Sequence, residues 1–172
     1  MAIASSIRNL KIFLSERSNE RPIYMTSGGF DPIHVGHVRC ILETSMLATN
    51  SGLHPSKMKG LVVIVVNADS FLIRKKGYAF MPLNQRMEII NAIQGVDYVV
   101  PWETSGDQTV CGVIKELKPR YFTKGGDRFD ASTIPEWEIC QRIGCEILTG
   151  IGGNKIQSSS SLVDRSKSYG KV

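Results

Sequence analysis

Several common signals are missing from the sequence, and each absence argues against a class of protein. The longest apolar run, LVVIVV at residues 61–66, is far shorter than the roughly 20 residues that a membrane-spanning helix needs. Residues 1–14 lack the basic start and long apolar core of a secretory signal. The four cysteines form no C-x-x-C pair and have no histidine cluster beside them, so neither a zinc site nor a redox motif is predicted. We therefore expect a cytoplasmic protein without a dedicated metal site and without a membrane partner.

Two nucleotide-binding fingerprints are also missing. Gly28 and Gly29 do not belong to a G-x-G-x-x-G sequence, which argues against a dehydrogenase. GIGGNK at residues 150–155 lacks the spacing of the phosphate loop G-x-x-x-x-G-K-[ST], and we interpret it as a turn. The formal net charge is +5, but the basic residues stand in short groups beside glycines, in RKKG at 74–77 and TKGGDR at 123–128, without an interleaved aromatic face. This distribution favours phosphorylated small molecules over nucleic acid as partners.

Apolar runs of strand length alternate with stretches of helical period over the 172 residues. This alternation predicts an α/β fold, a single Rossmann-like doubly wound domain with a parallel five-stranded sheet. The predicted strands cover residues 22–27, 61–68, 97–101, 120–124 and 146–150. The predicted helices cover residues 37–48, 83–94, 108–117 and 135–142, with a last helix starting near residue 160. A further amphipathic helix is expected at 5–15, outside the core unit, so we divide the chain into an N-terminal helical extension, 1–20, and a main domain, 21–172.

The stretch GGFDPIHVGH, residues 28–37, carries two of the three histidines. It stands where the first predicted strand is followed by the first predicted helix, at the carboxyl edge of the sheet, where open α/β folds bind ligands. Glycines let a ligand approach the backbone closely, and a helix start offers free N–H groups and a positive dipole end. His34 and His37 lie one helical turn apart and add donors that can follow charge on a rearranging phosphate. The stretch therefore predicts phosphoryl or nucleotidyl transfer.

The same stretch resembles a known signature. G-F-D-x-x-H-x-G-H, at residues 29–37, is similar to the motif of the cytidylyltransferase-like nucleotidyltransferases. Six positions are fixed, and at average residue usage a chance match is on the order of 10^-8 per starting position. The resemblance implies that residues 21–172 form a nucleotidyltransferase domain.

The segment after this signature agrees with the family. VVNADSFLIRKKG, residues 65–77, resembles the second-strand segment of these enzymes. Asn67 and Asp69 then stand at the strand end, and Arg74 and Lys76 stand in a basic, mobile loop after it.

Two later segments extend the resemblance. Residues 81–103, which include Arg86, are similar to the helix and strand that follow in the family. KPRYFTKGGD, residues 118–127, is similar to the adenylyltransferase half of the bacterial heptose-phosphate kinase/adenylyltransferases. The resemblance covers roughly residues 22–166.

The last motif, QSSSSLVDR at residues 157–165, stands where the family has a Ser-Thr-Thr or Ser-Ser-Thr run that opens its final helix. Hydroxyls and backbone amides at a helix start can hold the β- and γ-phosphates of a nucleotide. This chain has serine throughout, which keeps the hydroxyl oxygen and loses a methyl group. In isolation the run also fits a flexible serine-rich linker, but its place between GIGGNK and LVDR favours phosphate binding.

The resemblance implies that a phosphate oxygen of the acceptor attacks the α-phosphorus of a nucleoside triphosphate in line, with pyrophosphate leaving and no covalent enzyme intermediate. The catalytic residues are then His34 and His37, on the α-phosphate and the leaving pyrophosphate, and Lys76, which closes over the phosphates. The expected nucleotide-binding residues are Gly28, Gly29, Phe30, Asp31, Gly36, Arg86, Lys124, Gly126, Asp127, Ser158, Ser159 and Ser160. The expected acceptor or phosphate contacts are Asn67, Asp69, Arg74 and Arg165. Magnesium is expected to arrive with the triphosphate.

The sequence leaves three functions open. The leading one is an enzyme that transfers a nucleoside monophosphate from a triphosphate, with ATP favoured, to a phosphorylated sugar or polyol. The first alternative is a CTP-dependent cytidylyltransferase that acts on glycerol phosphate or an amino-alcohol phosphate. The second is a nucleotide-binding module without catalysis, against which the intact His34, His37 and Lys76 argue. Relatives also make a homodimer an expectation.

Overall fold

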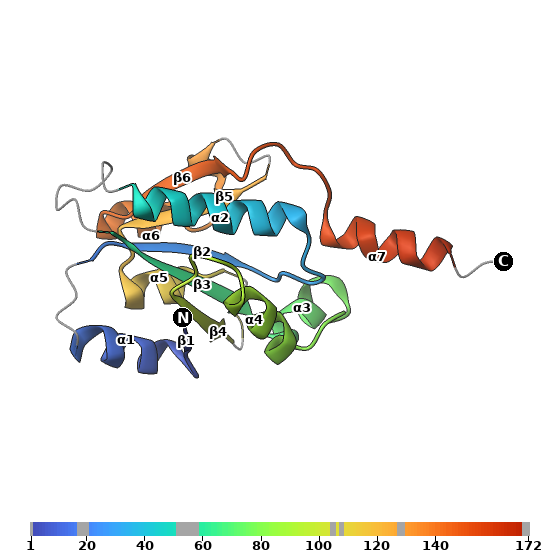
Figure 1. The fold of residues 1–172 in the computed structure, drawn as a ribbon, viewed down its shortest axis with the longest axis horizontal. Coiled ribbons are helices and arrows are strands. Elements are labelled where there is room, and N and C mark those ends of the chain that lie inside the picture. Colours follow the sequence, from blue (N-terminus) through green and yellow to red (C-terminus); the bar gives the residue numbers. More distant parts are fainter. Residues whose placement is uncertain are drawn as a thin grey trace.

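The computed structural model describes residues 2–16, 21–50, 59–103, 106, 109–126 and 130–169. These residues form a six-stranded sheet in the order β1-β4-β3-β2-β5-β6, in which every neighbouring pair is parallel (Figure 1). The strands are β1 Ala2–Ile3, β2 Ile23–Gly28, β3 Leu61–Asn67, β4 Tyr98–Trp102, β5 Tyr121–Gly125 and β6 Glu146–Ile151. The predicted α/β fold with a parallel, Rossmann-like sheet is confirmed. The predicted count of five strands is wrong, because β1 spans two residues and is too short to leave a periodic pattern.

Helices cover both faces of the sheet. The helices are α1 Ile7–Glu16, α2 Val35–Thr49, α3 Asp69–Lys76, α4 Leu83–Asn91, α5 Cys111–Leu117, α6 Trp137–Ile143 and α7 Ser159–Ser168, with a short 3-10 helix, η2, at Ala131–Thr133. Alternate residues of β3 point to opposite faces, so Val63 and Val65 join one core and Ile64 joins the other. Helices α1, α5 and α6 pack on the first face, and α2 and α4 pack on the second. The continuous apolar run in β3 is explained by this burial on both faces.

The N-terminal segment is part of this packing. Strand β1 pairs with β4 at the edge of the sheet, and Ile7 and Leu10 of α1 are buried in the core with only 5% and 1% exposure. The sequence predicted the helix correctly but placed it outside the core unit, and that placement is wrong. The apolar stripe of this amphipathic helix packs on the sheet and so belongs to the core unit.

The basic segment after β3 differs from the prediction as well. Arg74 and Lys76 lie in the last turn of helix α3, where a loop was expected, and Gly77 ends the helix in the left-handed conformation with φ of 83°. Three consecutive basic side chains close to the negative end of the helix dipole stabilise it. Lys76 is therefore presented by a helix.

The strand order shows at which edge of the sheet a ligand is expected to bind. Strand β2 lies between β3 and β5, so the chain runs to one side after β2 and returns to its other side at β5. Open α/β sheets bind ligands at the carboxyl ends of the strands at such a switch point. Helix α7 begins over this edge and then projects away from the body of the protein (Figure 1).

Candidate active site

A cavity of about 480 Å³ opens at the switch point. Its walls come from the carboxyl ends of β2, β3, β5 and β6, from helix α3, and from the starts of α2 and α7. The predicted site residues that line it are Gly28, Gly29, Phe30, Asp31, His34, Gly36, His37, Asn67, Lys76, Lys124, Gly126, Ser158, Ser159 and Ser160. The structure thus brings together residues from segments that are far apart in the sequence. Asp127 lies outside the described residues.

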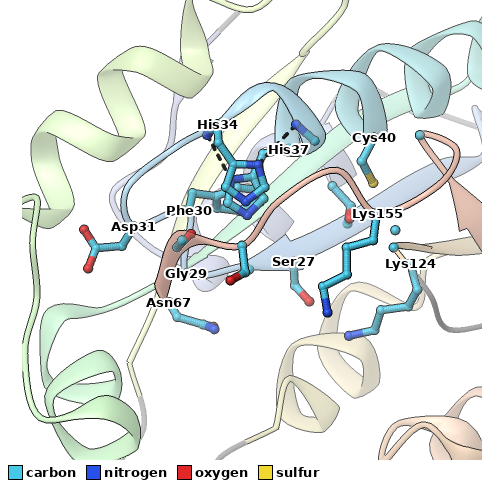
Figure 2. A pocket seen from close by; sticks show the side chains of 18 of the residues that line it. Ser27, Gly29, Phe30, Asp31, His34, His37, Cys40, Asn67, Lys124 and Lys155 are labelled. Carbon is cyan, nitrogen blue, oxygen red and sulfur yellow. Dashed lines mark hydrogen bonds between the residues drawn. The ribbon is translucent and has the colours of Figure 1, made fainter. Parts of the chain in front are cut away.

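The two histidines open helix α2 and fix each other's orientation. His34 is the N-cap, and its Nδ1 accepts the N–H of Gly36 at 3.1 Å. The Nδ1 of His37 accepts the N–H of His34 at 3.3 Å. The two rings stack with centroids 3.7 Å apart, and Phe30 packs edge-on against His37 (Figure 2). Since each Nδ1 is an acceptor, each neutral ring carries its proton on Nε2.

Burial keeps both rings neutral. It lowers the pKa of His37 from 6.5 to about 3, with a smaller contribution from the charge of His34. Burial also lowers the pKa of His34. At pH 7 the pair therefore offers two neutral Nε2–H donors to the cavity that it lines, and positive charge comes from lysines.

Lys76 of α3 is held by Asp31, which lies in the loop that carries the two histidines. Its Nζ lies 2.9 Å from Oδ2 of Asp31 and donates to the carbonyl oxygen of Asp31 at 2.7 Å. The Asp31 carboxylate, which is buried, also accepts the N–H groups of Phe80 and Met81 at 2.7 and 2.6 Å. It points away from the histidine rings (Figure 2). Asp31 therefore joins the histidine loop to α3 and to the segment before α4.

Arg86 does not line the cavity. Its guanidinium is fully buried and donates to the carbonyl oxygens of Gly29, Asn67 and Met81 at 2.6, 2.8 and 2.9 Å. It also pairs with Oδ1 of Asp69 at 2.5 Å. The structure thus makes Arg86 and Asp69 positioning residues, which fix the backbone where β2 and β3 end.

The serine run caps the start of α7. The hydroxyl of Ser158 accepts the N–H of Ser161, and the hydroxyl of Ser161 accepts the N–H of Ser158, both at 3.1 Å. The hydroxyl of Ser159 donates to the carbonyl oxygen of Pro32 at 2.9 Å, which ties α7 to the histidine loop. The first amides of a helix have no partner within it, and Ser158, Ser159 and Ser160 at the start of α7 line the same cavity as the histidines.

Of the three other residues predicted to contact the acceptor or a phosphate, one lines the cavity and two do not. Asn67 ends β3 at the cavity wall, and its Oδ1 is buried without a hydrogen bond to any residue that the structure describes. Arg74 and Arg165 are exposed on α3 and α7 and do not line the cavity.

Residues 25–143 match the protein family described as Cytidylyltransferase-like. The chain belongs to the cytidylyltransferase-like family. This match confirms the resemblance predicted from the signature at residues 29–37, and with it the nucleotidyltransferase class of the chain.

Curated relatives in this comparison are named Bifunctional protein HldE. That of Hahella chejuensis (strain KCTC 2396) is 31% identical over 147 residues, and that of Yersinia pestis (strain Pestoides F) is 34% identical over 123 residues. The matches cover 84% and 70% of this chain but only 28% and 23% of those proteins. The chain therefore spans less than a third of the length of these relatives.

Solved structures share the fold of this cytidylyltransferase-like chain. A lipopolysaccharide core biosynthesis protein from Thermoplasma volcanium matches 76% of this chain and 95% of its own, with a TM-score of 0.56 and 24% identity. The pantoate-beta-alanine ligase from Francisella tularensis matches 92% of this chain and 68% of its own, with a TM-score of 0.56 and 11% identity. At these identities the likeness supports the fold only.

Lys155 is a cavity residue of this family member that the sequence did not predict. It lines the cavity from the loop after β6, and it extends beside Lys124 (Figure 2). The loop is attached to α2, because Gly152 donates its N–H to Glu43 at 2.7 Å and has φ of 88°. A Cβ at Gly152 would lie 2.7 Å from the backbone nitrogen of Cys40. The sequence predicts only a turn for GIGGNK. Gly152, which permits this close approach of the loop to α2, is the one local signal that the segment packs against another element.

Glu136 is a further cavity residue that the sequence did not predict. It immediately precedes α6, its side chain is 6% exposed, and its Oε2 lies 3.5 Å from Nζ of Lys124. No spacing rule links a glutamate at the start of the predicted helix 135–142 to a distant strand end, so the sequence has no signal for it.

The donor set of the cavity suits phosphate better than a protein-held metal ion. Within the described ranges, no group of three or more His, Cys, Asp or Glu side chains could hold a metal ion. The carboxylates of Asp31 and Glu136 are each paired with a lysine. None of the described helices is long and apolar enough to cross a membrane.

Proposed function

We propose that this chain transfers a nucleoside monophosphate from a nucleoside triphosphate, with ATP favoured, to a phosphorylated sugar or polyol, and releases pyrophosphate. The nucleotidyltransferase class follows from the family. ATP is favoured because the KGGD run at residues 124–127 resembles that of adenylyltransferases. The magnesium complex of the triphosphate is the substrate.

One observation carries this proposal. Two sets of neutral hydrogen-bond donors, the stacked His34 and His37 at the start of α2 and the serines at the start of α7, line one cavity. The contact between Ser159 and Pro32 holds the two helix starts together. Because both helices direct their positive ends to the cavity, it suits a polyphosphate.

The proposed reaction needs positioning and charge stabilisation from these residues. An oxygen of the acceptor phosphate is anionic at neutral pH, so it attacks the α-phosphorus without a general base. As the P–O bond to pyrophosphate breaks, the Nε2–H groups of His34 and His37 donate to the phosphoryl oxygens on which charge develops. Lys76 offsets that charge from α3. Removal of one such preorganised donor typically costs a factor of about 10²–10³ in rate.

The acceptor side of the cavity is proposed to be the β3–α3 wall. Lys75 and Lys76 line it, and they supply positive charge for a phosphate group. Asn67 lies beside them with a buried oxygen that can accept a hydroxyl hydrogen. We further propose a cytoplasmic location and a homodimer, both expected from the sequence.

A thermal-shift titration separates this proposal from its alternatives. Wild-type protein is heated with magnesium and ATP, CTP, GTP or UTP in parallel, because a ligand at about 100 times its dissociation constant adds roughly 2.7 kcal/mol of stability. Stabilisation by ATP supports the proposal, whereas stabilisation by CTP alone supports the cytidylyltransferase. Stabilisation without turnover on any acceptor supports the non-catalytic module, and no stabilisation by any of the four contradicts the proposal.

A further inference from the structure

Glu136 is a buried acid on the cavity wall to which the proposed mechanism gives no role. Its side chain is 6% exposed, and its Oε1 accepts the N–H of Val110 at 3.5 Å. Its Oε2 is buried and has no hydrogen bond to any part of the chain that the structure describes. Oε2 lies 3.5 Å from Nζ of Lys124, and this contact is an ion pair without a hydrogen bond.

Such an oxygen indicates a missing donor. Nearly all buried polar atoms in native proteins have a hydrogen-bond partner, and exceptions gather at functional sites. An ionised carboxylate can only accept hydrogen bonds. The partner of Oε2 must therefore carry a hydrogen on oxygen or nitrogen, which a hydroxyl group supplies and an unprotonated phosphate does not.

The proposed function assigns the two walls of the cavity to different substrates. Strand β2 and its histidines lie between the β3–α3 wall and the β5–α6 wall. The proposed acceptor phosphate lies at the β3–α3 wall, which has Lys75 and Lys76, and Glu136 lies with Lys124 on the β5–α6 wall. The nucleoside then lies at the wall with Glu136, and its ribose carries hydroxyl groups that can donate to Oε2.

From these observations we infer that Glu136 determines specificity for ribonucleotides by accepting a hydrogen bond from a ribose hydroxyl of the bound triphosphate. The inference rests on the proposed function, because it requires a nucleotide in this cavity. A buried acceptor that is built to bind a hydroxyl strongly disfavours an analogue that lacks it, since the acceptor is then left unpaired. Glu136 thus selects the sugar, and the histidines bind the phosphates.

Calorimetric titrations with nucleotide analogues test this role. The magnesium complexes of ATP, 2′-deoxy-ATP and 3′-deoxy-ATP are titrated into wild type, Glu136→Ala and Glu138→Ala, with the CTP series used if CTP is the nucleotide that stabilises the protein. Glu138 is exposed in the first turn of α6, two residues after Glu136, and does not line the cavity. Wild type and Glu138→Ala are expected to bind at least one deoxy analogue tenfold or more weakly than ATP. In Glu136→Ala this ratio is expected to fall below about 2.

Two further variants serve as controls, one in case Glu136→Ala does not fold and one for the loss of the ion pair between Glu136 and Lys124. Glu136→Gln keeps the size of the side chain and a weaker acceptor, so it is expected to lower the preference severalfold if Glu136→Ala does not fold. Lys124→Met is expected to weaken all three nucleotides and to keep the preference, because Glu136 remains the acceptor.

Three results would overturn the inference. One is a wild type without a preference, and the second is a preference that survives both substitutions of Glu136. The third is an equal loss of affinity for all three nucleotides in Glu136→Ala, which would make the ion pair purely structural. If wild type binds none of the triphosphates, the proposed function fails together with the inference. If it binds them and Glu136 does not alter the preference, the inference alone fails.

Discussion

Nζ of Lys76 lies 2.9 Å from Oδ2 of Asp31 and donates to the carbonyl oxygen of the same residue. The cation that was expected to close over the reacting phosphates is thus held by the loop that carries the two histidines. Asp31 has no exposed side-chain surface in this pair, and Lys76 retains 19% of its own. This arrangement keeps the ammonium group at the cavity wall before substrate binds.

Loss of Lys76 should lower the transfer rate of the folded enzyme. Lys76→Met removes a preorganised charge at the phosphates, so the transfer rate is expected to fall by a factor of about 10²–10³. Steady-state assays on the folded variant measure this loss. Lys115→Met is the matched control, since Lys115 is exposed on α5 and lies outside this cavity. Equal rates for the two variants would remove Lys76 from the mechanism.

Arg86 should matter chiefly for stability. Arg86→Met removes the donors to three carbonyl oxygens and leaves the Asp69 carboxylate without its partner. The Asp69 side chain is 41% exposed, so most of the cost comes from the three carbonyl oxygens that lose their donor, at about 1–3 kcal/mol for each buried acceptor. Urea unfolding measures this cost, with Arg142→Met, an exposed substitution on α6, expected to stay within about 0.5 kcal/mol of wild type. A loss below about 1 kcal/mol for Arg86→Met would contradict the role assigned to it.

Two neighbouring glycines offer a matched pair in the loop that carries Lys155. Gly152 and Gly153 have φ of 88° and 74°, so alanine costs about 1–2 kcal/mol at either position. At Gly152 the added Cβ also meets backbone atoms of Cys40 at 2.7 and 2.9 Å, whereas at Gly153 nothing lies within 4 Å. Overpacking adds about 1–3 kcal/mol, so Gly152→Ala should be the more destabilised in chemical unfolding. Equal losses would mean that the loop does not lie against α2.

The stability of the protein should fall below pH 6.5 because of His37. Its pKa is about 3 in the folded protein and 6.5 ordinarily, so in this range the unfolded chain binds a proton that the folded protein does not. The free energy of unfolding then decreases as pH falls, by at most about 1.4 kcal/mol per pH unit, until pH approaches about 3.

Urea unfolding of wild type and His37→Asn at pH 7.0, 6.5 and 5.0 isolates this effect. Between pH 6.5 and 5.0 wild type should lose about 1–2 kcal/mol more than the variant. Parallel losses in the two proteins would show that the imidazole is not held neutral.

The sequence predicted that His34, His37 and the serine run belong to one site, and the structure places them at one cavity. A strand end and two helix starts leave local signals for such a prediction. Motif spacing assigned Arg86 to the nucleotide, since a motif gives a residue's position in the chain and not the direction of its side chain. Glu136 and Lys155 reach the cavity through contacts between distant segments, and β1 forms only because β4 provides an edge. Those features depend on tertiary packing, which periodicity does not report.

The most direct measurement of the central claim is pyrophosphate release from magnesium-ATP and magnesium-CTP, with a panel of phosphorylated sugars and polyols, by wild type and by folded His37→Ala. The account predicts release by wild type that requires both a nucleotide and a phosphorylated acceptor, and a rate about 10²–10³ lower in the variant. Undiminished release by His37→Ala, or no release from any combination by a wild type that binds the nucleotide, would contradict it.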